Sequence, residues 1–218
     1  MGEGQGHIAD GGIYAEGTGR MTGITIKRHS DGAVLYEAPD ATNMKDAVEA
    51  AVRAGANLDG ASLEGMVLDH AWLVGASLNN AWLVDASLNN ASLNNASLNN
   101  ARLDGARLDH AKLVGAKLNN ARLDHAEFDS ETRLPTGETW EEYLRETLPA
   151  LLVSGGRALS EVATAEHWDC HDWDNCPMHA AFGAGDISDV PILLRPRAEQ
   201  FIQLFDAGLI PLEDVQPK

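Results

Sequence analysis

The sequence predicts a mainly β solenoid with a module of different composition at each end. Fifteen consecutive five-residue units run without a gap from Ala56 to Ser130, and nearly every unit has alanine first and leucine third. An α-helix repeats a face about every 3.6 residues and a strand about every two, so this spacing suits neither element alone. It suits a wall that turns at regular intervals, in which each unit stacks on its neighbours and shares their core.

The units also carry a resemblance to a known family. In register they read ANLDG ASLEG MVLDH AWLVG ASLNN AWLVD, three copies of ASLNN, then ARLDG ARLDH AKLVG AKLNN ARLDH AEFDS. The segment, residues 56–130, closely resembles the pentapeptide-repeat family, whose members form a right-handed quadrilateral β-helix with one unit on each side. The resemblance implies about four coils, with the third residue of each unit pointing inward. The implied structural core includes Leu58, Leu78, Leu98, Leu118 and Phe128.

Two short segments precede the units. Residues 1–21 are rich in glycine and have no apolar period, which is typical of a flexible leader. Over residues 22–55, two β-rich runs surround an Asp-Gly pair, which is a strong hairpin signal. Thr42 or Asn43 can cap a following helix that ends before Gly55. We expect this hairpin plus helix to form a small α/β cap over the first coil, because an open solenoid end exposes unpaired backbone groups.

Residues 131–218 predict an α-helical C-terminal module. Thr139 and Glu142 form a capping box that opens a helix through about Val153. A second helix is expected to begin near Pro196 and to carry Ala198, Phe201, Ile202 and Phe205 inward.

Composition limits the classes of function. The formal net charge is −17, and acidic residues outnumber basic ones by 16 to 6 after Ser130 but by only 9 to 5 within the units. Phosphate contacts need clustered cations, so this balance argues against direct nucleic-acid binding. No apolar run approaches the ~20 residues of a membrane span, and two cysteines do not make a disulfide framework. We expect a cytoplasmic protein without membrane contact, and the sequence does not distinguish a monomer from a homodimer.

One block holds residue types that bind metals: Cys170, His171, Cys176 and His179. Cys176 and His179 are three residues apart, which suits one helical turn of a zinc site. Five residues between the cysteines is not a usual zinc spacing, and no second ligand pair follows, so we expect no metal and no cofactor. Two buried thiols are the simpler interpretation. The block from 168 to 211 also resembles a segment of pentapeptide-repeat and uncharacterised proteins of phages and their bacterial hosts.

On the outer wall, residues one coil apart are twenty apart in sequence, so columns can be read directly. Two asparagine columns predict hydrogen-bonded amide ladders: Asn79, Asn99 and Asn119, and Asn80, Asn100 and Asn120. Asp104 would stack on Asp124, and Asp109 on Asp129, which makes both pairs candidates for a cation site.

Trp72 and Trp82 form the candidate partner surface, because exposed aromatic residues mark interfaces. The two residues lie ten positions apart, and hence on opposite sides of a four-sided coil. Trp82 would also lie one coil below Arg102, so a cation–aromatic contact explains Trp82 equally well.

Two functional interpretations from different classes follow. The first is a non-catalytic scaffold or protein-interaction protein of bacterial or phage origin with an unknown partner. We expect no catalytic residues, because no nucleophile elbow, phosphate loop or metalloprotease pair stands in its required context. The second is implied by the resemblance: some members of the family imitate duplex DNA and act on DNA gyrase or another DNA-binding enzyme. A zinc-binding C-terminal block is a further alternative.

Overall fold

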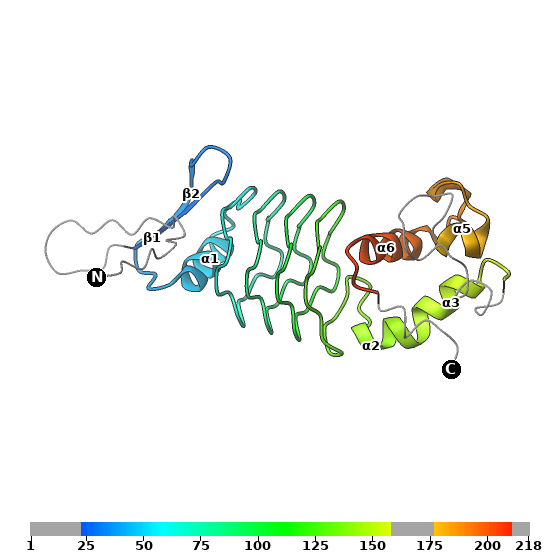
Figure 1. Cartoon of the computed structure of the whole chain (residues 1–218). Helices are drawn as coiled ribbons and strands as arrows, with labels where there is room; N and C mark the ends of the chain where they lie inside the picture. The colour runs from blue at the N-terminus through cyan, green and yellow to red at the C-terminus, as the bar shows by residue number, and fades with distance from the viewer. Residues whose placement is uncertain (1–22, 158–176, 211–218) are drawn as a thin grey trace, which may run out of the picture.

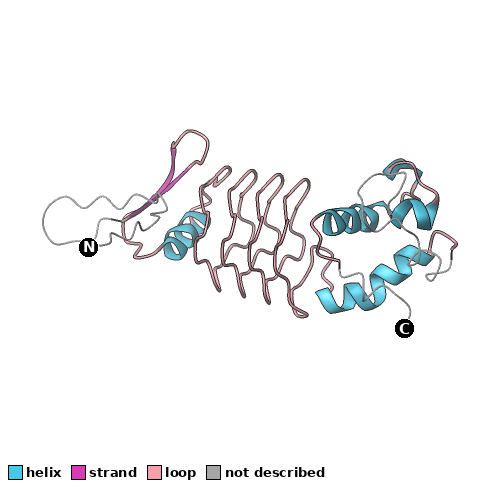
Figure 2. Ribbon diagram, viewed as in Figure 1, coloured by secondary structure: helices cyan, strands magenta, loops and turns pink. Residues whose placement is uncertain are grey.

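A computed structural model describes residues 23–157 and 177–210 and shows an elongated molecule (Figure 1). A hairpin and a helix lie at one end, stacked turns fill the middle, and helices gather at the other end (Figure 2). The predicted leader, residues 1–21, lies outside the described residues. None of the helices within the two described ranges has the length and apolar character that a bilayer crossing requires.

The N-terminal hairpin pairs β1 (Ile24–Lys27) with β2 (Val34–Ala38) in antiparallel register. Asp31 closes its turn, because the Asp31 Oδ1 accepts a hydrogen bond of 3.0 Å from the Ala33 N–H. Gly32 lies between them with a φ of 70°, a backbone conformation that favours glycine. The hairpin expected around the Asp-Gly pair is therefore present.

Helix α1 (Met44–Arg53) begins at Asn43, as the sequence indicates. The Asn43 side chain accepts a hydrogen bond from the Asp46 N–H, which has no partner within the first turn of the helix. The buried face of the helix belongs to the same hydrophobic cluster as the leucines of the central segment, and it consists of Ala47, Val48 and Ala51.

The hairpin and α1 contact the first coil of the central segment through hydrogen bonds. The Lys27 carbonyl accepts from the Ser62 N–H at 2.9 Å, and the Glu49 carboxylate accepts from the Trp72 N–H at 2.8 Å. In later coils, the corresponding N–H groups donate to the coil before them. The N-terminal segment thus supplies two acceptors that a preceding coil would otherwise provide.

Residues 56–136, called the rod below, wind so that residues twenty positions apart pair in parallel, from Asn57 with Ser77 to Arg107 with Glu127. The second residue of each unit forms the bridge, and the N–H of the following leucine donates to the next coil, as Leu93 does to the Lys112 carbonyl at 2.8 Å. These are single bridges, because each side turns after five residues; in the described residues, longer strands occur only as β1 and β2. The rod is therefore a β-helix built from short bridged sides.

Each side ends in a residue with a left-handed backbone, except in the last two units, which end at Ser130 and Thr136. The residues other than glycine at this place have φ values between 55° and 60°, and they are His70, Asn80, Asp85, Asn90, Asn95, Asn100, His110, Asn120 and His125. Asparagine, aspartate and histidine tolerate this region better than most residues, and glycine has no Cβ to clash. The fifth place of the unit is thus restricted by backbone geometry.

The third residue of each unit points inward. Leu58, Leu78 and Leu98 are fully buried, and Leu118 keeps only 9% of its surface exposed. Phe128 differs from the predicted column, because it is half-buried and packs against both the rod cluster and the helical cluster. Burying a leucine contributes about 2 kcal/mol, so the column is the main source of cohesion in the rod.

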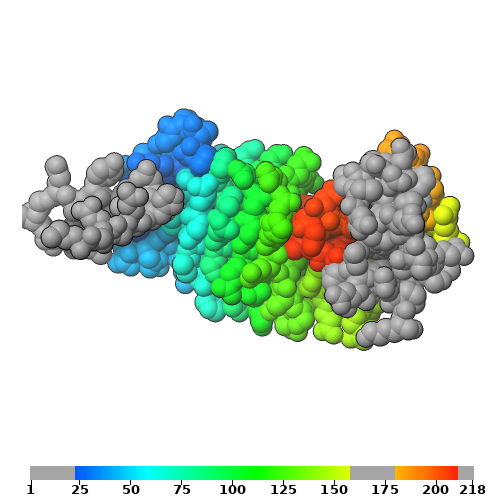
Figure 3. All heavy atoms as spheres, in the orientation of Figure 1, coloured from blue at the N-terminus to red at the C-terminus, as the bar shows by residue number. Residues whose placement is uncertain are grey.

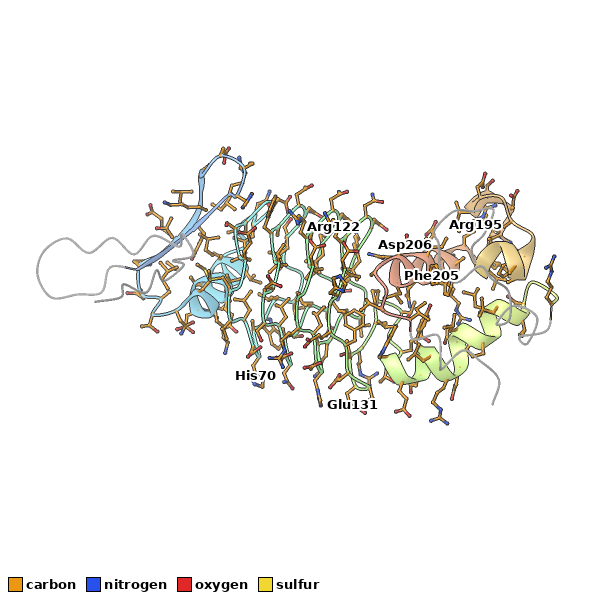
Figure 4. The ribbon with its side chains drawn as sticks, viewed as in Figure 1. His70, Arg122, Glu131, Arg195, Phe205 and Asp206 are labelled. Carbon is orange, nitrogen blue, oxygen red and sulfur yellow. The ribbon has the colours of Figure 1, made fainter. Side chains whose placement is uncertain are left out.

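The rod extends one unit beyond the fifteen that the sequence shows. Arg133 bridges Lys112 in parallel, its N–H donates to the Ala111 carbonyl, and its own carbonyl accepts from the Leu113 N–H at 2.8 Å. This is the pattern of the regular units, with a separation of twenty-one residues instead of twenty. Glu131 is the additional residue, and it projects from the same edge of the rod as His70 (Figure 4). The insertion hides the unit TRLPT, residues 132–136, from a strict five-residue register.

The predicted capping box opens the C-terminal helices. Thr139 accepts a hydrogen bond from the Glu142 N–H, and the Glu142 carboxylate accepts from the Thr139 N–H at 2.8 Å. The Thr139 backbone and hydroxyl bonds hold the pKa of Glu142 below its ordinary value. Helix α2 (Trp140–Glu142) starts directly after this cap.

The helix expected through Val153 is not a continuous α-helix. A π-helical turn, η1 (Tyr143–Thr147), separates α2 from α3 (Leu148–Val153), and the Leu148 N–H donates to the Tyr143 carbonyl five residues before it. Pro149 provides the physical reason: it has no N–H, and its ring would clash with the carbonyl four residues before it in a regular α-helix.

Helix α6 (Arg195–Asp206) is the second predicted helix, and its buried residues are Ala198, Phe201 and Leu204. The sequence stripe placed Ile202 and Phe205 inward instead of Leu204, whereas both are half-buried. α5 (Pro177–Phe182) and the 3-10 helix η3 (Ile187–Asp189) complete this module. In the space-filling view, α6 lies against the last coil of the rod (Figure 3).

Candidate functional site

The outer wall of the rod has four sides, and each is defined by one column of bridged residues. The first side carries Asn57, Ser77, Ser97 and Lys117; the second carries Ser62, Trp82, Arg102 and Arg122; the third carries Val67, Ser87, Arg107 and Glu127; the fourth carries Trp72, Ser92, Lys112 and Arg133.

An amide ladder occupies the first side, as predicted. The Asp59 Oδ1 accepts from the Asn79 N–H at 2.9 Å, and the Asn79 Oδ1 accepts from the backbone and side-chain amides of Asn99 at 3.1 and 3.0 Å. The Asn99 Oδ1 accepts in turn from the Asn119 N–H at 3.2 Å. Asn80, Asn100 and Asn120 form no such side-chain bonds within the described residues, because they fill the left-handed corners. The ladder binds coil to coil, so these amides act in stability.

Arginines fill the space between the carboxylates of the second side. Arg122, labelled in Figure 4, lies 3.0 Å from Asp104 and 2.9 Å from Asp124, and Arg102 donates to Asp104 at 3.1 Å. The hydrogen bond from Arg122 holds the pKa of Asp124 below its usual range. This stack was a candidate cation site, but the guanidinium already supplies the positive charge there.

The carboxylates of the third side are paired in the same way. Arg107 lies 3.1 Å from Glu127 and 3.5 Å from Asp109. Asp129 accepts from the His110 N–H at 2.8 Å, its Oδ1 lies 2.8 Å from the Thr132 hydroxyl, and its other oxygen contacts the His110 ring. The Asp109–Asp129 stack therefore also has protein partners in place of a metal ion.

Acidification tests the contribution of Asp129 to stability. Burial raises the pKa of this carboxyl, but the bonds from the His110 N–H and the Thr132 hydroxyl outweigh burial and hold the pKa below its ordinary value. Its ionised form therefore stabilises the fold above the unfolded pKa of about 4, and this stability is lost as the pH falls through the folded pKa.

Asp129→Asn is expected to lower the free energy of unfolding by about 1 kcal/mol at pH 7, and this deficit should disappear as the pH falls through the folded pKa of Asp129. Urea unfolding across that range measures the effect. Glu146→Gln serves as the control, because it removes the same charge from an exposed position in a helix. A deficit that stays constant with pH would contradict the assignment.

Of the two tryptophans predicted as a partner surface, Trp82 already has contacts within the protein. It is half-buried, because the His29 ring stacks on it with 3.5 Å between centroids and the Arg102 guanidinium lies 4.3 Å from its ring. The cation–aromatic alternative is therefore present, together with a histidine stack that joins the N-terminal segment to the rod. That histidine lies 53 positions away in the sequence, so no local pattern shows it.

Trp82→Ala is expected to lower the free energy of unfolding by about 2 kcal/mol, since it removes both ring contacts and apolar burial. Trp72→Ala is the matched control, because Trp72 is 61% exposed and should cost less than about 1 kcal/mol. Urea denaturation followed by circular dichroism compares the two. Equal losses of unfolding free energy in the two variants would show that the contacts of Trp82 with His29 and Arg102 do not stabilise the protein.

A pocket of about 750 Å³ lies between the last coil and α6. The Gln203 side chain crosses it, and donates to the Leu118 carbonyl at 2.8 Å and to the Ala121 carbonyl at 3.2 Å. In earlier coils, the carbonyl at the place of Ala121 accepts a hydrogen bond from an N–H of the next coil. Gln203 therefore supplies a donor that a further coil would otherwise provide. No local sequence pattern indicates this contact, because its partners lie more than eighty residues apart.

The metal-binding candidates are not placed by the structure. Cys170, His171 and Cys176 lie outside the described residues, and so does the side chain of His179. Within residues 23–157 and 180–210, no group of three or more metal-binding side chains comes together.

The comparisons identify the repeat. The family profile described as "Pentapeptide repeats" matches with 8 copies over residues 54–81, 73–109 and 101–130. A comparison with curated proteins gave no match.

Solved structures of pentapeptide repeat proteins are also similar to the chain. Rfr23 from the cyanobacterium Cyanothece 51142 is 33% identical over 32% of this chain and 51% of its own, with a TM-score of 0.29. A protein of the Arabidopsis thaliana thylakoid lumen is 29% identical over 34% and 54%, with a TM-score of 0.28. HetL from Nostoc sp. strain PCC 7120, a protein involved in heterocyst differentiation regulation, is 33% identical over 36% and 40%, with a TM-score of 0.25.

The chain thus spans about half the length of these proteins or less, and the assignment rests on the repeat match together with the twenty-residue bridging pattern. This chain therefore contains a pentapeptide-repeat segment, which places residues 54–130 in the pentapeptide-repeat family.

Proposed function

We propose that the chain is a non-catalytic protein-interaction scaffold, in which a right-handed rod of about four coils presents fixed side chains to a protein partner. One observation carries this proposal: Trp72 remains 61% exposed on a wall where most other side chains are bound to one another. A large exposed aromatic residue on a rigid support is typical of a partner surface.

The chemistry of the wall supports a non-catalytic role. A general acid or base needs a carboxylate or imidazole that is available to a substrate. Asp104, Asp124 and Asp109 contact arginines, and Asp59 and Asp69 accept hydrogen bonds from the next coil. These carboxylates are committed to holding the rod together.

Partner capture tests the proposal. The full-length chain, immobilised and exposed to lysate of the organism that encodes it, is compared with Trp72→Ser by quantitative mass spectrometry. We expect at least one protein that is enriched by the natural chain and depleted by the variant. Purified partner and chain should then form a complex in solution. The same set of proteins with both baits would overturn the proposal.

The family implies an alternative, in which the chain imitates duplex DNA and acts on DNA gyrase or another DNA-binding enzyme. Mimicry needs a continuous row of carboxylates, whereas arginines neutralise the carboxylates of the second and third sides. A supercoiling assay with micromolar protein distinguishes the two, and we expect no inhibition.

For the zinc alternative at Cys170, His171, Cys176 and His179, we expect elemental analysis of the purified chain to find no stoichiometric zinc.

A further inference from the structure

The fourth side of the rod differs from the other three in its charge. Its units, residues 71–75, 91–95, 111–115 and 132–136, contain no aspartate or glutamate, whereas each of the other sides has at least one. This is unusual in a protein with a net charge of −17. Three of these units are in the regular five-residue register, and the structure adds the fourth, which follows the insertion at Glu131.

Two cations lie next to each other on this side without a carboxylate between them. Lys112 and Arg133 are bridged neighbours and both are exposed. Like charges opposite each other on adjacent strands are unfavourable, so this pair is a favourable place for an external anion. By contrast, Arg102, Arg107 and Arg122 each lie within 4.0 Å of a carboxylate.

Nearby protein groups compensate this charge only in part. The Arg133 side chain donates to the Gly137 carbonyl at 3.1 Å. Hydrogen bonds with Thr139 are the main cause of the lowered pKa of Glu142, and the charge of Arg133 lowers this pKa further. Within the described residues, neither Lys112 nor Arg133 has a carboxylate oxygen within 4.0 Å.

Apolar surface continues the same side. Trp72 is in the column of Lys112, two coil steps away, which is roughly 10 Å at the spacing of neighbouring strands. In the adjoining column Val114 is 38% exposed and Val74 is half-buried. The Glu49 carboxylate bonds to the Trp72 N–H, so an anion is disfavoured at the tryptophan end and favoured at the cation end.

We infer that the fourth side binds an acidic, extended protein segment, in which one apolar side chain contacts Trp72 and a pair of carboxylates about three residues away contacts Lys112 and Arg133. This inference rests on the proposed interaction function and adds the surface and the chemistry of the partner. The spacing follows from the geometry, since three extended residues span roughly 10 Å.

A nucleic acid fits this side less well than a peptide. A phosphate backbone needs several cations along its path, and the chain as a whole has a net charge of −17. A short segment with two carboxylates places its charge only where the two cations lie. The valines and Trp72 suit an apolar side chain better than a phosphate.

Selection from a displayed library of random peptides on the full-length chain tests the inference without knowledge of the natural partner. We expect enriched peptides to combine an apolar residue with an acidic pair. The double variant Lys112→Glu/Arg133→Glu should weaken their binding at least about tenfold, measured by fluorescence anisotropy. Lys117→Glu, an exposed cation of the first side, is the matched control and should change binding less than about twofold. Thermal unfolding of each variant confirms that it is folded.

The outcomes separate this inference from the proposed function. Selected peptides without acidic residues, or equal weakening by Lys117→Glu, would overturn the inference. Preferential binding of single-stranded DNA that depends on Lys112 and Arg133 would replace the peptide by a nucleic acid and would also overturn it. A captured protein partner that binds the double variant normally would leave the scaffold function in place and move the site elsewhere.

Discussion

Leu93→Asp is expected to unfold the rod. Leu93 is fully buried, and its N–H donates to the next coil. The substitution removes about 2 kcal/mol of apolar burial and leaves a carboxylate without a partner, which costs several kcal/mol more. The total exceeds about 5 kcal/mol, which is comparable with the whole stability of many domains. Far-UV circular dichroism should show loss of the β signal, and no cooperative thermal transition should remain.

Two variants control this experiment. Ser92→Asp introduces the same charge one residue earlier, on the outward face, and should change the free energy of unfolding by less than about 0.5 kcal/mol. Leu93→Met keeps an apolar side chain of similar volume and should cost less than about 1.5 kcal/mol. A Leu93→Asp protein that unfolds at the same temperature as the natural chain would show that the leucine column does not hold the rod together.

The rod was predictable because its signal is local and repeated. Each inward leucine is found in the same place of its unit, and the corners from Gly60 to His125 carry residues that tolerate a left-handed backbone. The Asn79–Asn99–Asn119 ladder was predictable for the same reason, since a fixed twenty-residue step identifies vertical neighbours.

The features that were missed depend on single residues or on distant contacts. Glu131 shifts the register by one residue, and Pro149 converts one helical turn to π geometry. The stack of His29 on Trp82 and the cap by Gln203 join segments that are far apart in the sequence. Without the register after Glu131, Arg133 cannot be assigned to the fourth side, so its pairing with Lys112 was not visible in the sequence.

Leu134→Ala tests the hidden unit directly. Leu134 is buried in the second hydrophobic cluster, and it follows Arg133, which bridges Lys112. Truncating a buried leucine should cost about 2–4 kcal/mol, which lowers the urea midpoint measured by tryptophan fluorescence and circular dichroism. If the residues after Ser130 were only a linker, the cost would be near zero. Leu193→Ala is the matched control, because Leu193 is 90% exposed and undergoes the same chemical change.

Hydrogen exchange shows where the stability is lost, because opening free energies differ along a solenoid. The Leu113 N–H donates to the Arg133 carbonyl, so its exchange should accelerate in Leu134→Ala as the last unit opens more often. The Leu78 N–H, which donates to the Ser97 carbonyl, lies about one and three-quarter coils before Leu113 and should keep its protection. Faster exchange at both sites would indicate global destabilisation, and no change at Leu113 would contradict a sixteenth unit stacked on the rod.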